Sequence, residues 1–126
     1  MADSIIREKS FRFALETIEV FKQLQADREF VLSRQLLRSG TSIGANVEEA
    51  LAGQSRRDFL AKMALASKEA RETRYWLTLL QKSNLTKIEL SQATANIEEL
   101  IRILTSIVKT TAKDPATQNL KLKTQN

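Results

Sequence analysis

The residues that usually carry acid–base, nucleophilic and metal chemistry are scarce in this chain. It contains no His and no Cys among its 126 residues. The commonest general base, the commonest metal ligand and the thiolate nucleophile are therefore missing. Ser, Thr and Lys are present, but no spacing in the sequence supplies any of them with a base. We therefore expect no catalytic residues, no cofactor and no enzymatic activity.

Two carboxylate pairs, Glu48-Glu49 and Glu98-Glu99, are the nearest approach to a metal site. A di-metal carboxylate centre inside a helical bundle requires Glu-x-x-His motifs, which a chain without His cannot form. Paired Glu residues on a helix are usually solvated, and this interpretation is preferred. An all-carboxylate magnesium site is the alternative, and we expect no metal.

The cations are more informative, because 20 Lys and Arg face 15 Asp and Glu, giving a net charge of +5. Opposite the apolar seam of a predicted helix over residues 56–82 lies a basic strip with one aromatic residue: Arg57, Lys68, Arg71, Tyr75 and Lys82. Arg34 and Arg38, one helical turn apart, form a second candidate patch. The third candidate is the basic C-terminal region with Lys113, Lys121 and Lys123. Such patches bind phosphate backbones with little sequence preference, whereas the alternative is a solvated face with internal pairs such as Lys68–Glu72.

The elements that must position these cations are helices. Gly and Pro are rare, and Leu, Ala, Glu, Lys, Arg and Gln are abundant, which favours helix almost throughout. The first expected break is Gly53-Gln54-Ser55, where Ser55 and Asp58 form a predicted capping box. The second is Ser83-Asn84, which precedes a second predicted capping box formed by Thr86 and Glu89. The third is Asp114-Pro115. We predict helices over 4–25, 28–52, 56–82 and 87–113 in one domain, residues 1–114. Residues 115–126 are predicted to be a polar, flexible tail.

Apolar residues in the third and fourth predicted helices recur at alternating steps of three and four. The third has Phe59, Met63, Ala66, Ala70, Thr73, Leu77 and Leu80, and the fourth has Leu90, Ala93, Ile97, Leu100, Leu104 and Ile107. Antiparallel bundle helices bury such seams against one another. The fold class is therefore all-α, an antiparallel up-down four-helix bundle.

The first predicted helix carries two apolar stripes rather than one. Phe11, Leu15 and Ile18 lie on one face, with Ala14 and Phe21. The nearly opposite face holds the stripe that we expect to form an oligomer interface: Ile6, Phe13, Val20 and Leu24. The alternatives are a more central helix, or cover from the N-terminal arm or the tail.

The second predicted helix has an unusual run of small residues. Gly40 and Gly44 allow a neighbouring backbone to come close, and a phosphate loop is excluded because no Lys-Ser/Thr follows them. Beside its apolar face runs a polar row at steps of four, three and four: Gln35, Ser39, Ser42 and Asn46. We interpret the row as a hydrogen-bonded seam that fixes helix register. A ligand-binding slot is the alternative.

Two stretches, RQLLRSGTSIGANVEEA (34–50) and FLAKMALASKEARETRYWL (59–77), resemble a bacterial family of small four-helix-bundle proteins encoded in intervening sequences of 23S rRNA genes. They are also similar to the accessory variability proteins of diversity-generating retroelements. The resemblance spans residues 8–112. It implies a homopentameric assembly of bundles with a basic surface and, in retroelement members, binding to nucleic acid and to a reverse transcriptase.

Two functional hypotheses follow from the cations and the resemblance. The first is a non-enzymatic, oligomeric accessory protein that binds RNA or DNA through its basic surface. The second is a protein–protein scaffold without direct nucleic-acid contact, whose partner is another protein, for example a polymerase such as a reverse transcriptase. The longest apolar run is four residues, Met63 to Ala66, so we expect no membrane partner and a cytoplasmic location.

Overall fold

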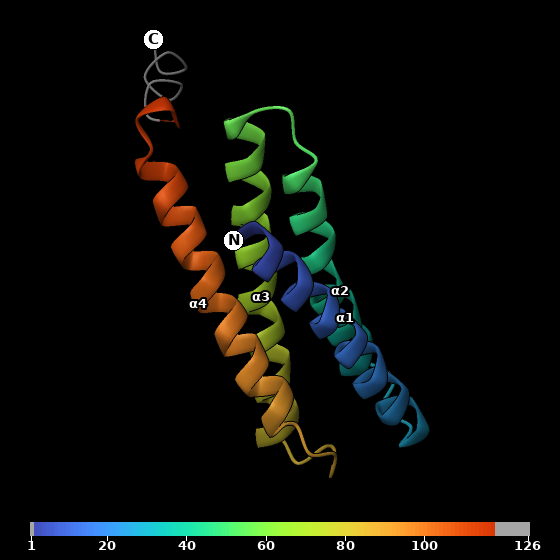
Figure 1. Ribbon diagram of the computed structural model, residues 1–126. Coiled ribbons are helices and arrows are strands. Elements are labelled where there is room, and N and C mark those ends of the chain that lie inside the picture. Colours follow the sequence, from blue (N-terminus) through green and yellow to red (C-terminus); the bar gives the residue numbers. More distant parts are fainter. Residues whose placement is uncertain (1, 118–126) are drawn as a thin grey trace.

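A computed structural model of the chain describes residues 2–117 and contains four helices in that range. They are α1 (Ala2–Ala26), α2 (Leu32–Leu51), α3 (Arg56–Lys82) and α4 (Ser91–Lys113). Each helix packs against its neighbour along the chain, and α4 packs back against α1. The α1–α2 and α3–α4 turns lie at one end of the molecule and the α2–α3 turn lies at the other (Figure 1). The predicted all-α fold with four packed helices is thus confirmed.

The observed helix boundaries match the predicted ones best where the sequence contains a side-chain cap. Helix α3 has the predicted bounds, and the Ser55 hydroxyl accepts a hydrogen bond from the Asp58 backbone N–H at 3.1 Å. The predicted capping box at Thr86 is wrong, because Thr86 and Glu89 instead cap short turns. Helix α4 consequently begins at Ser91, four residues later than predicted.

Helix α2 begins at Leu32 rather than at residue 28, because the chain makes a tight turn after α1. Arg28 adopts a left-handed backbone conformation with φ of 66°, which ends the helical path. The Glu29 carboxylate then accepts hydrogen bonds from the backbone N–H groups of Val31, Leu32 and Ser33 at 2.7–3.2 Å. This carboxylate satisfies donors that the first turn of a helix otherwise leaves without partners.

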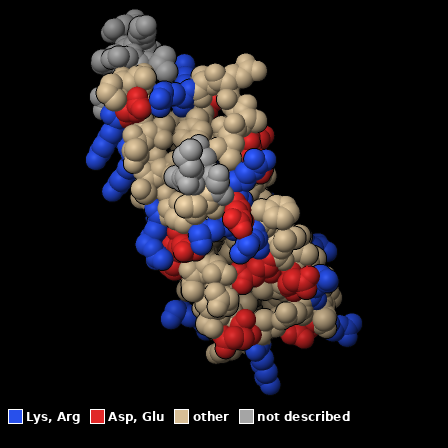
Figure 2. Space-filling model, in the orientation of Figure 1, with Lys and Arg blue, Asp and Glu red and all other residues tan. Residues whose placement is uncertain are grey.

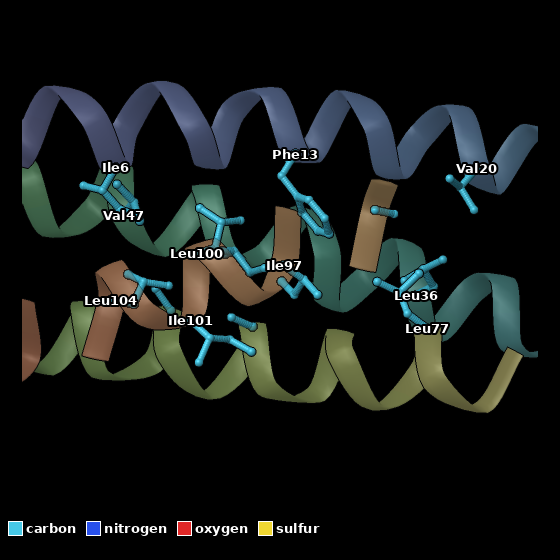
Figure 3. Close-up of a cluster of buried hydrophobic side chains, with 14 of the residues drawn as sticks. Ile6, Phe13, Val20, Leu36, Val47, Leu77, Ile97, Leu100, Ile101 and Leu104 are labelled. Carbon is cyan, nitrogen blue, oxygen red and sulfur yellow. The ribbon is translucent and has the colours of Figure 1, made fainter. Parts of the chain in front are cut away.

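The core is formed by the buried apolar faces of all four helices. The apolar seams predicted for α3 and α4 are buried, except that Phe59 and Ile107 are only partly buried at the edge. Figure 3 shows Phe13 and Val20 of α1 pointing into this core, toward the side chains of the other helices. The core therefore contains one of the two apolar stripes of α1.

The stripe of α1 that faces inward is the one that we expected at an oligomer interface, so that expectation is wrong. Ile6, Phe13, Val20 and Leu24 are buried inside the protomer. The stripe that faces outward contains Phe11, Leu15 and Ile18, with exposed fractions of 62%, 50% and 38%. A side chain that is already covered by its own chain has no surface to offer a second copy.

Two small polar residues explain why this stripe of α1, and not the other, faces the core. Ser10 and Thr17 are buried and complete a seam with steps of four and three along α1: Ile6, Ser10, Phe13, Thr17, Val20 and Leu24. A Cβ atom on Gly40 would lie 2.7 Å from the Thr17 side chain, and one on Gly44 would lie 3.3 Å from the Ser10 carbonyl oxygen. The close packing predicted for the two glycines is therefore confirmed, and its partner is α1.

The predicted polar row of α2 is only partly a seam. Ser39 is fully buried, and its Oγ accepts a hydrogen bond from the Thr73 hydroxyl of α3 at 2.9 Å. Ser42 and Asn46 are half-buried and donate to carbonyl groups of their own helix, at 2.6 and 2.9 Å. Gln35 is exposed and lies outside the seam. Only Ser39 joins two helices in the way that the row predicts.

Candidate nucleic-acid interface

The ion pairs of the described residues lie mainly along the seams between helices. Eight cations have carboxylate partners within 4.0 Å: Arg7, Lys9, Arg12, Lys22, Arg38, Arg56, Lys62 and Arg74. Most of these pairs join different helices, for example Lys9 to Glu99 at 3.0 Å and Arg74 to Glu98 at 3.4 Å. The carboxylates of the bundle are thereby used to hold helices together.

The cations without such a partner, within residues 5–117, gather on α3 and α4. Seven belong to these two helices: Arg57, Lys68, Arg71, Lys82, Arg102, Lys109 and Lys113. The other three are Arg28, Arg34 and Lys87. Figure 2 shows Lys and Arg side chains projecting along the edge that α4 forms, at the left. Positive charge that is not neutralised locally therefore concentrates on the outer side of α3 and α4.

A hydrogen bond joins the two helices of this surface and shows which of their residues lie beside each other. The Arg71 guanidinium of α3 donates to the Thr105 hydroxyl of α4 at 3.1 Å. Because the helices are antiparallel, Lys68 on α3 and Lys109 on α4 both lie one turn from this bond, in the same direction. We call the resulting surface the basic face and define it by five residues: Lys68, Arg71, Arg102, Lys109 and Lys113.

The α4 half of the basic face is a shallow groove of about 490 Å³. Cations and hydroxyls line it: Arg102, Thr105, Ser106, Lys109, Thr110 and Lys113, with Ile101 beside them. The hydroxyls can donate to phosphate oxygens, and the cations can neutralise them. Both groups suit a nucleic-acid backbone.

Sequence reasoning missed Arg102 and Lys109. The available signal was a net charge of +4 over residues 100–126, where Asp114 is the sole acidic residue. Steps of seven and four from Arg102 place Lys109 and Lys113 on one helical face. Of the third predicted patch, Lys113 lies in the last turn of α4, in agreement with the predicted helix over 87–113, and Lys121 and Lys123 lie outside the described residues.

The basic strip predicted on α3 lies on the outer side of that helix. Arg57, Lys68, Arg71, Tyr75 and Lys82 are all exposed. The pairing that we considered between Lys68 and Glu72 is not an ion pair, although the Lys68 charge helps to lower the pKa of that carboxyl. Arg57 and Lys82 stand near opposite ends of the helix, so Lys68, Arg71 and Tyr75 form the compact part of the strip.

The second predicted patch is divided by the structure, because Arg38 is engaged within the bundle. Its guanidinium pairs with Glu69 at 3.3 Å and also with Glu72 of α3. These contacts raise the pKa of Arg38, chiefly through the hydrogen bond to Glu72. The pKa of Glu72 is lowered, first by the hydrogen bond from the Trp76 indole and then by Arg38. Arg38 therefore clamps α2 to α3, while Arg34 is exposed.

The paired carboxylates of the sequence diverge in space. Glu48 pairs with Arg7 at 2.8 Å, while Glu49 pairs with Lys62 at 3.4 Å. Glu98 and Glu99 likewise face different cations. Within the described range, no group of three or more acidic residues is placed to hold a metal ion. None of the described helices combines the length and apolar character needed to cross a bilayer.

Comparison with known proteins agrees with the resemblance stated above. A profile of the 23S rRNA-intervening sequence protein family matches residues 2–106. The chain is also similar to a solved structure from Bacteroides thetaiotaomicron, a protein of unknown function from the S23 ribosomal protein family. The two are 43% identical with a TM-score of 0.81, and the match covers 86% of this chain and 99% of that one. The search of curated proteins gave no match.

Proposed function

The chain belongs to the family of 23S rRNA-intervening sequence proteins, and from this premise we propose that it is a non-enzymatic accessory protein that binds RNA along its basic face. The observation that carries the proposal is the division of charge in the bundle. Seam carboxylates neutralise the cations at the helix contacts, whereas the described α3 and α4 cations of the basic face have no carboxylate partner. RNA is preferred to DNA as the ligand because of the family's association with rRNA genes.

The chemistry of the basic face fits recognition of a backbone rather than of a sequence. Lys and Arg side chains on phosphates release condensed counterions, and this release supplies affinity that depends strongly on salt. Helix surfaces that offer cations and hydroxyls contact phosphate and sugar and carry little base information. The protein is accordingly proposed to hold RNA without reading a long sequence motif, and to perform no reaction on it.

Reversal of charge on the basic face tests this proposal. In a gel-shift titration with single-stranded RNA at ~50 mM salt, Lys68→Glu/Arg71→Glu and Arg102→Glu/Lys109→Glu should each weaken binding more than ~10-fold. The control is Lys22→Glu/Lys87→Glu, which changes the net charge equally at sites away from the basic face. Equal losses of affinity in all three variants would show that only the net charge matters, and would contradict a binding site at the basic face. Unchanged binding in both basic-face variants would also contradict the proposal.

A second candidate function, assembly with another protein, is favoured by the outward apolar stripe of α1. We define the α1 outer stripe as Phe11, Leu15 and Ile18, all of which are exposed. A groove of about 160 Å³ between α1 and α2 adjoins it, with Phe11, Ala14 and Gly44 in its lining. We propose that a second copy covers this stripe and builds a homo-oligomer, for which the resemblance implies five copies.

A reverse transcriptase is the other partner that the resemblance implies. A gene for such an enzyme beside the gene of this protein would favour a retroelement role. A position within a 23S rRNA gene would favour an intervening-sequence role instead. In either case, a second copy of the chain would cover the α1 outer stripe.

A further inference from the structure

One exposed aromatic residue lies within the α3 strip and has no role in the core. Tyr75 is 57% exposed on the outer side of α3. Arg71 precedes it by four residues and Lys68 by seven, and Lys82 follows it by seven. At 1.5 Å per residue these cations stand about 6 and 10 Å from Tyr75 along the helix axis, on the same ridge. The phenol ring is thus placed within a row of cations.

The ring of Tyr75 is also held in place by a contact with the neighbouring Trp76 ring. It packs against the Trp76 ring at 5.1 Å between centroids, with the ring planes 69° apart. The Trp76 indole N–H in turn donates to the Glu72 carboxylate at 2.9 Å, and Glu72 pairs with Arg38 of α2. A chain of contacts therefore runs from the α2–α3 seam to this surface ring. An exposed side chain that is fixed in this way loses less conformational freedom when a ligand covers it.

We propose that the RNA bound at the basic face is single-stranded there, and that an unpaired base stacks on Tyr75 while neighbouring phosphates contact Lys68 and Arg71. This inference rests on the proposed function and specifies its ligand. In a duplex the faces of the bases are already stacked on one another, so a protein aromatic ring can stack only on an unpaired base. Such stacking tolerates any base, because every base has a π face. The arrangement therefore combines sequence tolerance with selection for single strands.

The test compares two RNA probes and two variants by fluorescence anisotropy. The probes are a labelled single-stranded RNA of about twelve nucleotides and the same strand annealed to its complement. Tyr75→Ala should weaken binding of the single strand by about 5- to 150-fold, corresponding to one stacked base, and leave duplex binding unchanged. Tyr75→Trp, which keeps an aromatic platform, should retain single-strand binding.

The outcomes separate this inference from the function on which it rests. If the wild-type protein binds neither probe, the proposed function itself is wrong. If it binds RNA but Tyr75→Ala leaves the single-strand affinity unchanged, or if the duplex binds more tightly, only the single-strand inference is overturned. Thermal melting of Tyr75→Ala checks folding, and an unchanged midpoint is expected because the side chain is mostly exposed.

Discussion

Glu29 shows how a single carboxylate begins a helix that lacks an ordinary cap. The N-cap position of α2 is Val31, whose side chain offers no acceptor. Partial burial alone would raise the pKa of the Glu29 carboxyl. The hydrogen bonds from the backbone N–H groups of Leu32, Ser33 and Val31 outweigh that effect and hold the pKa below its ordinary value. The ionised carboxylate is therefore stabilised by folding, and it contributes stability at neutral pH.

Because the folded-state pKa of Glu29 is lowered, its contribution is present above the unfolded pKa and is lost as the pH falls through the folded pKa. Glu29→Gln mimics the protonated acid and should lower the free energy of unfolding at pH 7 by about 1 kcal/mol. Thermal melts of both proteins should show that this difference shrinks as the pH falls below about 4.3. A difference that stays constant or grows in acid would exclude this role for the Glu29 carboxylate.

Residue types also explain what sequence reasoning found and missed at this scale. Ser55 before Asp58 is a local signal, and its cap could be predicted. Thr86 before Glu89 gives the same signal, but both side chains are used in turns of the α3–α4 connection. A capping pattern does not reveal which backbone donors the chain's path will present to it. The role of Glu29 was missed because Glu is not a usual N-cap residue and because it lies two residues before the N-cap position, Val31.

At the scale of elements, spacing alone predicted the seams of α3 and α4 but not the inner face of α1. Both stripes of α1 are apolar, so hydrophobicity does not distinguish them. The choice depends on Thr17 and Ser10, which are small enough to meet Gly40 and Gly44 of α2. Such a match involves two helices at once, and a period counted along one helix cannot detect it. The α4 cations were missed for a different reason, because their net charge was counted without their helical spacing.

The clamp between α2 and α3 gives an element-scale prediction. Arg38 contacts two carboxylates of α3, and its side chain is about half exposed. Replacing it by Met keeps much of the aliphatic stem and removes the ion pairs, so Arg38→Met should lower stability by about 1 kcal/mol. Its RNA affinity should fall far less than that of Lys68→Glu/Arg71→Glu. Denaturant unfolding and the same gel shift measure the two effects.

Arg34→Met is the matched control for this clamp, since Arg34 lies one turn away on α2 and is exposed. It should leave stability within about 0.5 kcal/mol of the wild type. A large loss of RNA binding in Arg38→Met at unchanged stability would instead move the nucleic-acid site to α2.

At the scale of the whole molecule, the α1 outer stripe leads to a prediction about assembly. We expect a solution mass several times the 14.3 kDa of one chain, because an unpaired apolar stripe is best covered by another copy. Phe11→Asp/Leu15→Asp places two charges in the proposed contact and should reduce the mass toward that of one chain. Light scattering coupled to size exclusion measures it.

The control for assembly places the same charges at exposed leucines elsewhere. Leu65 and Leu85 lie on α3 and in the α3–α4 turn. Leu65→Asp/Leu85→Asp should keep the wild-type mass. A wild-type mass of one chain, or a stripe variant that keeps the assembled mass, would show that the α1 outer stripe is not the interface.

The central claim, that the five cations of the basic face contact RNA phosphates, is tested most directly by the salt dependence of binding. The affinity of the wild-type protein for a single-stranded RNA should be measured from ~50 to ~200 mM salt. Each contacted phosphate of a single strand contributes about −0.7 to the slope of log K against log salt, so five contacts predict a slope of roughly −3.5. Absence of binding at ~50 mM salt, or binding with a slope near zero, would contradict the account.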